Sequence, residues 1–115
     1  MTPFDVLFAA VAVTELEPAR RWYGELFGRP PDVVVHEHEV MWRVGDGAWL
    51  YVLVDAGRAG HGLVTLALAD LDGAVAALDA RGIAGPIEAV GDAGRKAVLG
   101  DPCGNTVHLI EVTPR

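Results

Sequence analysis

An internal repeat constrains this chain more than any other feature of its sequence. The segment VAVTELEPA at residues 11–19 aligns with LALADLDGA at residues 66–74, an offset of 55 residues. Apolar, acidic and alanine positions match between the two segments. Each segment has the pattern of a strand, an acidic turn and the start of a helix, so the chain is predicted to consist of two similar halves.

Acidic residues mark the predicted start of a helix in each half. Glu17 and Asp72 lie where negative charge favours a helix N-terminus, and Pro18 suits the first helical position. Gly28 and Gly82 are predicted to end the two helices. Apolar residues recur at helical spacing behind both starts: Ala19, Trp22, Tyr23 and Leu26 in the first helix, and Ala74, Ala77 and Leu78 in the second. We assign Trp22, together with Trp42, to the core between helix and sheet.

The remainder of each half predicts three strands. They cover residues 33–36, 40–44 and 48–54 in the first half, and 87–90, 96–99 and 106–112 in the second. Residues 56–62 contain three glycines and predict a flexible connector. The prediction is one α+β domain over residues 1–115, with module 1 at about 4–55 and module 2 at about 62–113.

Composition limits the partners that such a domain could have. The formal charge is −7, and the nine Lys and Arg residues are scattered along the sequence, so nucleic acid and anionic membranes are not expected as partners. The longest apolar run near the N-terminus, residues 6–13, is too short to span a membrane. The single cysteine, Cys103, excludes an internal disulfide and fits a reducing compartment, so we expect a cytoplasmic protein.

Several stretches together resemble the vicinal oxygen chelate superfamily, which includes glyoxalase I, extradiol dioxygenases, fosfomycin-modifying enzymes and bleomycin-resistance proteins. The similar stretches are residues 11–23, 26–28, 66–72 and, above all, DPCGNTVHLIE at 101–111. The family usually ends on Asp-Pro-Asp-Gly-Asn, and Cys103 replaces the second Asp here. The resemblance implies two tandem βαβββ modules, whose curved mixed sheet surrounds a ligand cup.

The resemblance also implies where metal-using members of the family hold their ion. Two strand positions in each module supply the ligands, and these fall on Phe8, Tyr51, Leu63 and His108. Only His108 is a good ligand, because phenylalanine and leucine have no lone pair and tyrosine is a rare ligand. We therefore expect no metal and no cofactor. Whether His61 joins the site stays open, since it shares strand parity with Leu63.

Two other sequence features suggest a metal site or a nucleophile. His36-Glu37-His38 resembles a metal-binding pattern, but it falls between two predicted strands and is interpreted as a solvated turn. Cys103 lies in a glycine-rich turn with no histidine nearby in the sequence, which favours an incidental cysteine over a nucleophile.

Strand parity predicts the lining of the cup. It brings apolar and aromatic side chains together with a few polar ones, which is typical of a small-molecule site. Trp49 and Tyr51 can stack on a flat ring, and Arg43 can donate to a carboxylate or phosphate. The alternative is that these side chains fill the cup as a second core. The predicted ligand-binding residues are Phe8, Met41, Arg43, Trp49, Tyr51, Leu63, Thr65, Val98, His108 and Ile110.

These features favour a metal-independent protein that binds an aromatic or amphipathic small molecule, as bleomycin-resistance proteins do. A metal-dependent lyase, isomerase or dioxygenase of the same superfamily is the alternative. A third possibility is a metal-free enzyme with His108 as a general base, the candidate catalytic residue. A homodimer is expected, and whether modules are exchanged between its chains stays open.

Overall fold

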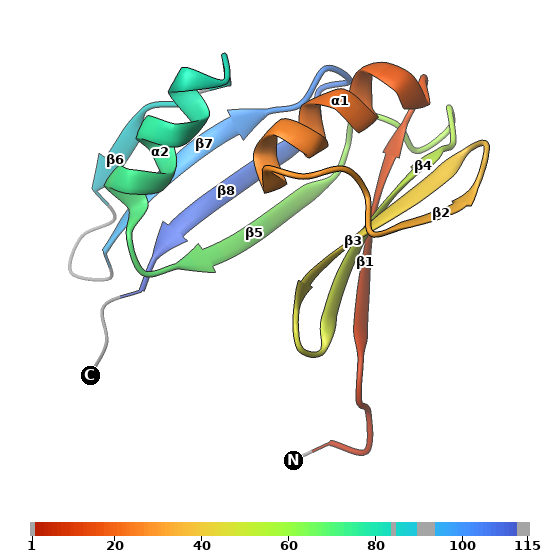
Figure 1. Ribbon diagram of the computed structural model, residues 1–115, viewed down its shortest axis with the longest axis horizontal. Coiled ribbons are helices and arrows are strands. Elements are labelled where there is room, and N and C mark those ends of the chain that lie inside the picture. Colours follow the sequence, from red (N-terminus) through yellow and green to blue (C-terminus); the bar gives the residue numbers. More distant parts are fainter. Residues whose placement is uncertain (1, 84, 90–93, 113–115) are drawn as a thin grey trace.

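The computed structural model describes residues 2–83, 85–89 and 94–112 (Figure 1). The first half contains β1 (Leu7–Val13), α1 (Leu16–Phe27), β2 (Val33–His36), β3 (Glu39–Gly45) and β4 (Ala48–Val54). The second half contains β5 (Leu63–Leu68), α2 (Leu71–Ala80), β6 (Ile87–Ala89), β7 (Arg95–Gly100) and β8 (Thr106–Glu111). The predicted order of strand, helix and three strands, twice over, is confirmed. Val90, which was predicted to belong to the sixth strand, lies outside the described residues.

Each module forms its own four-stranded mixed sheet. The first sheet has the order β1-β4-β3-β2, and the second sheet repeats it as β5-β8-β7-β6. The first strand of each module pairs in parallel with the last, β1 with β4 and β5 with β8, and the other pairs are antiparallel. The predicted α+β class with repeated βαβββ modules is confirmed.

Both helices begin two residues earlier than predicted. Glu15 and Asp70 are the N-cap residues, so Glu17 and Asp72 lie inside the first turn. The Asp70 side chain accepts a hydrogen bond from the Gly73 N–H, whereas Glu15 makes no such bond. Pro18 is the third helical residue, where a missing N–H still costs nothing because the first four N–H groups have no partner within the helix.

The start of α2 is also held by β8. Glu111 Oε2 accepts a hydrogen bond from the Leu71 N–H at 3.0 Å, and Arg95 bridges Glu111 and Asp72 with bonds of 2.9 to 3.3 Å. The Leu71 N–H and the Arg95 guanidinium hold the pKa of Glu111 below its ordinary value of 4.5. Hydrogen bonds from Arg95 likewise lower the pKa of Asp72.

The core lies between the helices and one face of each sheet. Alternate residues of the strands point into it, as the twofold periodicity of strands requires. Tyr23 of α1 and Trp42 of β3 are fully buried, with ring centroids 6.2 Å apart. Trp42 therefore lies in the core as assigned from the sequence. Trp22 packs against the core but is only partly buried.

A buried polar cluster joins the two modules. Asp101 in the turn between β7 and β8 accepts a 2.8 Å hydrogen bond from the Tyr23 hydroxyl of α1. Asn105 donates to the Ala12 carbonyl of β1 and accepts from the Gly62 N–H in the connector. Burial, with the neighbouring Asp101 carboxylate, raises the pKa of Tyr23. The glycine-bearing connector is thus tied to the second module at Gly62.

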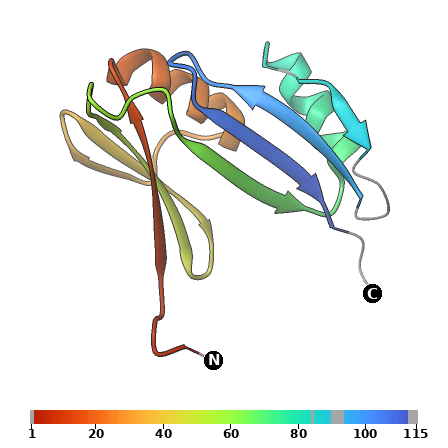
Figure 2. The same cartoon turned by 180° about the vertical axis from the view of Figure 1, so that it is seen from behind.

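The two helices lie on the same side of the two sheets: they pass in front of the strands in Figure 1 and behind them in Figure 2. The sheets meet where the end of β1 approaches the start of β5, and in both views β1 and β5 diverge from that point. Between the described strands of the two sheets there is no pairing. Of the described helices, none is long and apolar enough to cross a membrane.

Candidate ligand-binding faces

Each sheet has a free face, the side turned away from the helices, and the sequence-predicted site residues lie on these two faces. The free face of the first sheet contains Phe8, Met41, Arg43, Trp49 and Tyr51, and the free face of the second sheet contains Leu63, Thr65, Val98, His108 and Ile110. The intervening residues of the central strands, such as Leu50 and Leu109, are buried.

Aromatic side chains dominate the free face of the first sheet. Phe8 pairs with Trp49 across β1 and β4, and their rings stack at a centroid distance of 6.3 Å and an interplanar angle of 18°. Tyr51 lies two residues further along β4, opposite Met41 of β3. Phe8 is 52% exposed although it is apolar. This face therefore presents a stacked aromatic surface to solvent, which a flat ligand ring could extend.

The Arg43 guanidinium bonds to the backbone of the hairpin turn. It pairs with Trp49 in the register of β3 and β4, but its Nε and Nη2 donate to the carbonyl oxygens of Gly45 and Asp46 in the hairpin turn. Those two donors are already used by the backbone. Its Nη1 makes no hydrogen bond to the described residues and stays available to a ligand carboxylate or phosphate.

His108 is at the centre of the free face of the second sheet. It lies on β8 between Thr65 of β5 and Val98 of β7. Its ring is partly exposed and makes no hydrogen bond to the described residues. Both ring nitrogens are thus free to donate to or accept from a ligand.

The four positions implied by the family do not form a ligand set for a metal. Phe8 and Tyr51 belong to the first sheet, and Leu63 and His108 belong to the second. Val11 of β1 lies beside Gly62 of the second module. Phe8 lies three residues, or about 10 Å, further back along β1 from that point. Within residues 2–83, 85–89 and 94–112, no group of three His, Cys, Asp or Glu side chains could hold a metal ion. The donor chemistry of these positions does not fit a metal.

The other candidate residues lie apart from these faces. His36 ends β2 and His38 is in the following turn, and both are exposed, as the solvated-turn interpretation predicted. Cys103 lies 3.7 Å from the Thr14 hydroxyl at the junction of the modules. His61 is exposed and precedes β5. Sequence reasoning missed the role of Asp101 and Asn105 at the junction, because it interpreted residues 100–105 only as a turn.

Comparisons with known proteins are consistent with this architecture. Residues 6–109 match the Glyoxalase/Bleomycin resistance protein/Dioxygenase superfamily. The chain is 34% identical to a glyoxalase/bleomycin resistance protein from Catenulispora acidiphila DSM 44928, with a TM-score of 0.88 over 94% of this chain and 98% of that one. It is 25% identical to TnmS3, an antibiotic binding protein from Streptomyces sp. CB03234, with a TM-score of 0.78 over 98% of this chain and 99% of that one.

A third structure, a lactoylglutathione lyase from Agrobacterium tumefaciens, shares the fold at 19% identity, with a TM-score of 0.78 over 96% of this chain and 95% of that one. No curated protein matches the sequence. The family match covers nearly the whole chain, and the repeated βαβββ modules are those that the resemblance implied. The chain therefore belongs to the glyoxalase/bleomycin resistance protein/dioxygenase superfamily.

Proposed function

We propose that this protein binds an aromatic or amphipathic small molecule on its free faces without a metal. The observation that carries the proposal is the exposed aromatic surface of the first sheet, where Phe8 and Trp49 stack beside Tyr51. An apolar surface of this kind, with few polar groups, suits recognition of a flat ligand more than it suits hydrolytic or redox chemistry. His108 supplies a hydrogen-bonding group from the second sheet.

The relative TnmS3 supports a binding role over an enzymatic one, since it is described as an antibiotic binding protein. The superfamily also contains enzymes, so a metal-dependent lyase, isomerase or dioxygenase remains the alternative function. Phe8 and Leu63 argue against it, because neither can donate a lone pair to a metal. A cytoplasmic location is part of the proposal and fits the free thiol of Cys103.

We further propose that the protein is a homodimer in which a second copy completes the cup. Leu7 and Phe8 on β1 and Leu63 on β5, the edge strands of the two sheets, are 67%, 52% and 63% exposed. Apolar side chains this exposed are typical of a surface that another molecule covers. β1 and β5, the edge strands of the two sheets, diverge in Figure 2, which supports a cup that a second copy completes.

Light scattering at micromolar concentration tests the dimer. We expect the mass of two chains for the natural protein and the mass of one chain after the double substitution Leu7→Ser and Phe8→Ser, which makes the exposed end of β1 polar. A monomeric natural protein would contradict the dimer. Val112→Ser, at another half-exposed apolar residue, is the control and should leave the mass unchanged.

A thermal-shift screen with aromatic acids and polycyclic natural products tests the binding function. A ligand at about 100 times its dissociation constant should stabilise the protein by about 2.7 kcal/mol. Trp49→Ala should abolish that shift. His108→Gln keeps a donor and an acceptor and should retain much of the affinity, whereas His108→Leu should lose about 1 to 3 kcal/mol of binding free energy.

Metal analysis separates the two functions. The proposal expects no stoichiometric zinc, nickel, iron or manganese in the purified protein. Stoichiometric metal that disappears in His108→Leu would overturn metal-independent binding and favour the lyase or dioxygenase alternative.

A further inference from the structure

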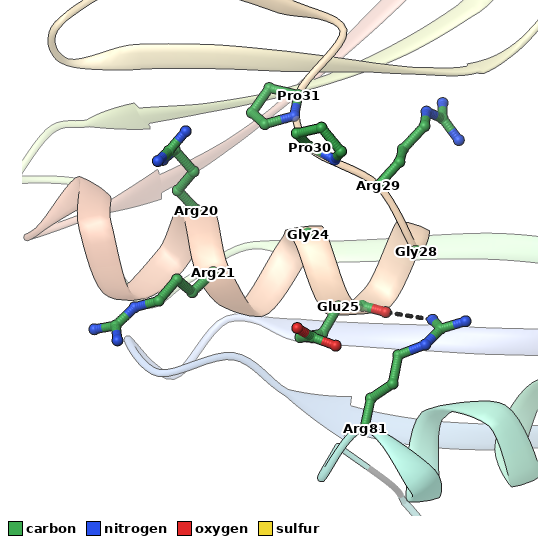
Figure 3. A pocket seen from close by; sticks show the side chains of 9 residues that line it. All are labelled: Arg20, Arg21, Gly24, Glu25, Gly28, Arg29, Pro30, Pro31 and Arg81. Carbon is green, nitrogen blue, oxygen red and sulfur yellow. Dashed lines mark hydrogen bonds between the residues drawn. The ribbon is translucent and has the colours of Figure 1, made fainter.

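We infer that a groove over α1 is a second binding site, which takes an oligophosphate anion. The groove has a volume of about 440 Å³ and lies on the helix side of the molecule, away from the two free faces (Figure 3). Its lining comes from α1, the segment that follows α1, and the end of α2. The lining residues are Arg20, Arg21, Gly24, Glu25, Gly28, Arg29, Pro30, Pro31 and Arg81.

The groove gathers positive charge on an acidic protein. Four of the nine Lys and Arg residues line it, although they are dispersed over 62 positions of the sequence and the chain carries a net charge of −7. Figure 3 shows Arg20 on one side of Gly24, and Arg21 and Arg81 on the other. Folding thus concentrates arginines that appear scattered in the sequence, and guanidinium groups bind phosphate oxygens in bidentate fashion.

Several of these guanidinium groups keep donors available. Arg21 makes no hydrogen bond or ion pair with the described residues. Arg20 meets Glu17 at 3.4 Å, but both side chains are exposed, and such surface pairs contribute little. Arg29 uses its Nε and Nη2 on Asp32 and the Arg43 carbonyl, which leaves Nη1 without a partner among the described residues.

Arg81 has a fixed position at one end of the groove. Its Nη1 donates to the Glu25 carbonyl in the last turn of α1, and its guanidinium also lies beside Gly28 (Figure 3). This bond orients the side chain in advance. A preoriented arginine loses less conformational entropy when it binds an anion.

Gly24 lines the groove and is not required there by packing. Glycine inside a helix reduces its stability relative to alanine. A Cβ at Gly24 would meet only the Arg29 carbonyl oxygen, at 3.6 Å, which is an ordinary contact. The absence of a side chain keeps the groove open between the arginines on its two sides.

Acidic residues in and beside the groove would repel an anion. Glu25 is the acidic residue of the lining, and Glu17 and Asp32 pair with Arg20 and Arg29 beside it. A singly charged anion would compete poorly with these carboxylates. An oligophosphate carries several negative charges and so competes better with these carboxylates, which is why we assign it.

Isothermal titration of the full chain with inorganic tripolyphosphate at low ionic strength tests the site. We expect saturable binding of one anion per chain, weakened at least fivefold in the double variant Arg20→Gln and Arg21→Gln. Glu25→Gln should bind more tightly than the natural protein, because an opposing charge is removed. Gly24→Leu should abolish binding by filling the groove while its thermal unfolding stays cooperative.

Arg58→Gln is the matched control, since Arg58 is exposed in the connector outside the groove. The inference is overturned if tripolyphosphate does not saturate, or if Arg58→Gln weakens binding as much as the double variant does. ATP in a parallel titration identifies the source of the phosphates. Equal affinity would support a free oligophosphate, and tighter binding of ATP would support a nucleotide.

Discussion

At the scale of single residues, the hydroxyl of Tyr23 has the clearest energetic role. It donates to Asp101 in a buried site, where the carboxylate also accepts from Asn105 and from the Cys103 N–H. Tyr23→Phe should destabilise the protein by about 1 to 3 kcal/mol, because a buried carboxylate loses one of its donors. The measurement is the free energy of urea unfolding.

Tyr51→Phe is the control for that substitution. The Tyr51 side chain is partly exposed and its hydroxyl bonds to none of the described residues, so its removal should change stability by less than about 0.5 kcal/mol. Similar losses for Tyr23→Phe and Tyr51→Phe would show that the bond to Asp101 does not stabilise the fold.

The three tryptophans should differ in their contribution to stability. Trp42 is fully buried and donates from its indole N–H to the Arg29 carbonyl, so Trp42→Ala should cost about 3 to 5 kcal/mol. Trp22 and Trp49 are only partly buried, and their alanine variants should cost less. Thermal unfolding of the three variants checks this order, which fails if Trp49→Ala is as unstable as Trp42→Ala.

Strand parity correctly assigned the residues of the central strands to the two faces of each sheet, because side chains alternate between those faces. It placed Tyr51 and His108 on the sides opposite the buried Leu50 and Leu109. Parity could not predict the direction of a long side chain. Arg43 has the predicted position in the register, yet its guanidinium bonds to the hairpin turn, a choice that depends on local carbonyl oxygens.

At the scale of elements, the strands were easier to predict than the starts of the helices. The repeat locates both helices to within one turn. More than one acidic residue lies near the start of each helix, and the sequence alone does not show which of them is the N-cap residue. Asp70 caps α2 through the Gly73 N–H, while Asp72 pairs with Arg95 of β7. That second interaction connects residues 23 positions apart, which local sequence patterns do not reveal.

The contact between Glu111 and the start of α2 should make stability depend on pH. The folded-state pKa of Glu111 is held below 4.5, so its ionised form stabilises the fold above that pH. As the pH falls through 4.5 toward the lower folded-state value, this contribution is lost. Glu111→Gln should therefore be less stable than the natural protein at pH 7, and the difference should vanish in acid.

Chemical unfolding of both proteins between pH 7 and pH 3 measures that difference. Glu88→Gln is the control, because Glu88 on β6 is exposed and forms no ion pair with the described residues. A difference between Glu111→Gln and the natural protein that stays constant with pH would contradict the role of the ionised carboxylate.

At the scale of the whole molecule, the repeat predicts two modules but not how they join. Periodicity describes each module separately, whereas the junction depends on a few polar contacts between distant residues. Asn105 bonds to Ala12 of the other module, 93 positions away. The sequence pattern at residues 101–105 indicated a turn, and the same residues turned out to connect the modules.

Asn105→Ala should therefore destabilise the whole protein and not only its turn. Asn105 is fully buried, and its removal leaves the Gly62 N–H and the Ala12 carbonyl without their partner. Each buried group left unpaired costs about 1 to 3 kcal/mol. We expect a loss in this range or above it in urea unfolding at pH 7, with both modules still unfolding together.

Asn105→Asp distinguishes the contribution of the Asn105 hydrogen bonds to stability from the contribution of its packing. Its size is nearly that of asparagine, but it cannot donate to Ala12, and it sets a second carboxylate against Asp101, whose Oδ2 is 2.9 Å from Asn105 Nδ2. Two buried carboxylates repel each other, so one of them should have a raised pKa. Asn105→Asp should be less stable than Asn105→Ala at pH 7 and should regain stability relative to it at pH 5. If Asn105→Asp matches the natural protein at pH 7, the junction does not depend on the amide, and shape alone would hold the two modules together.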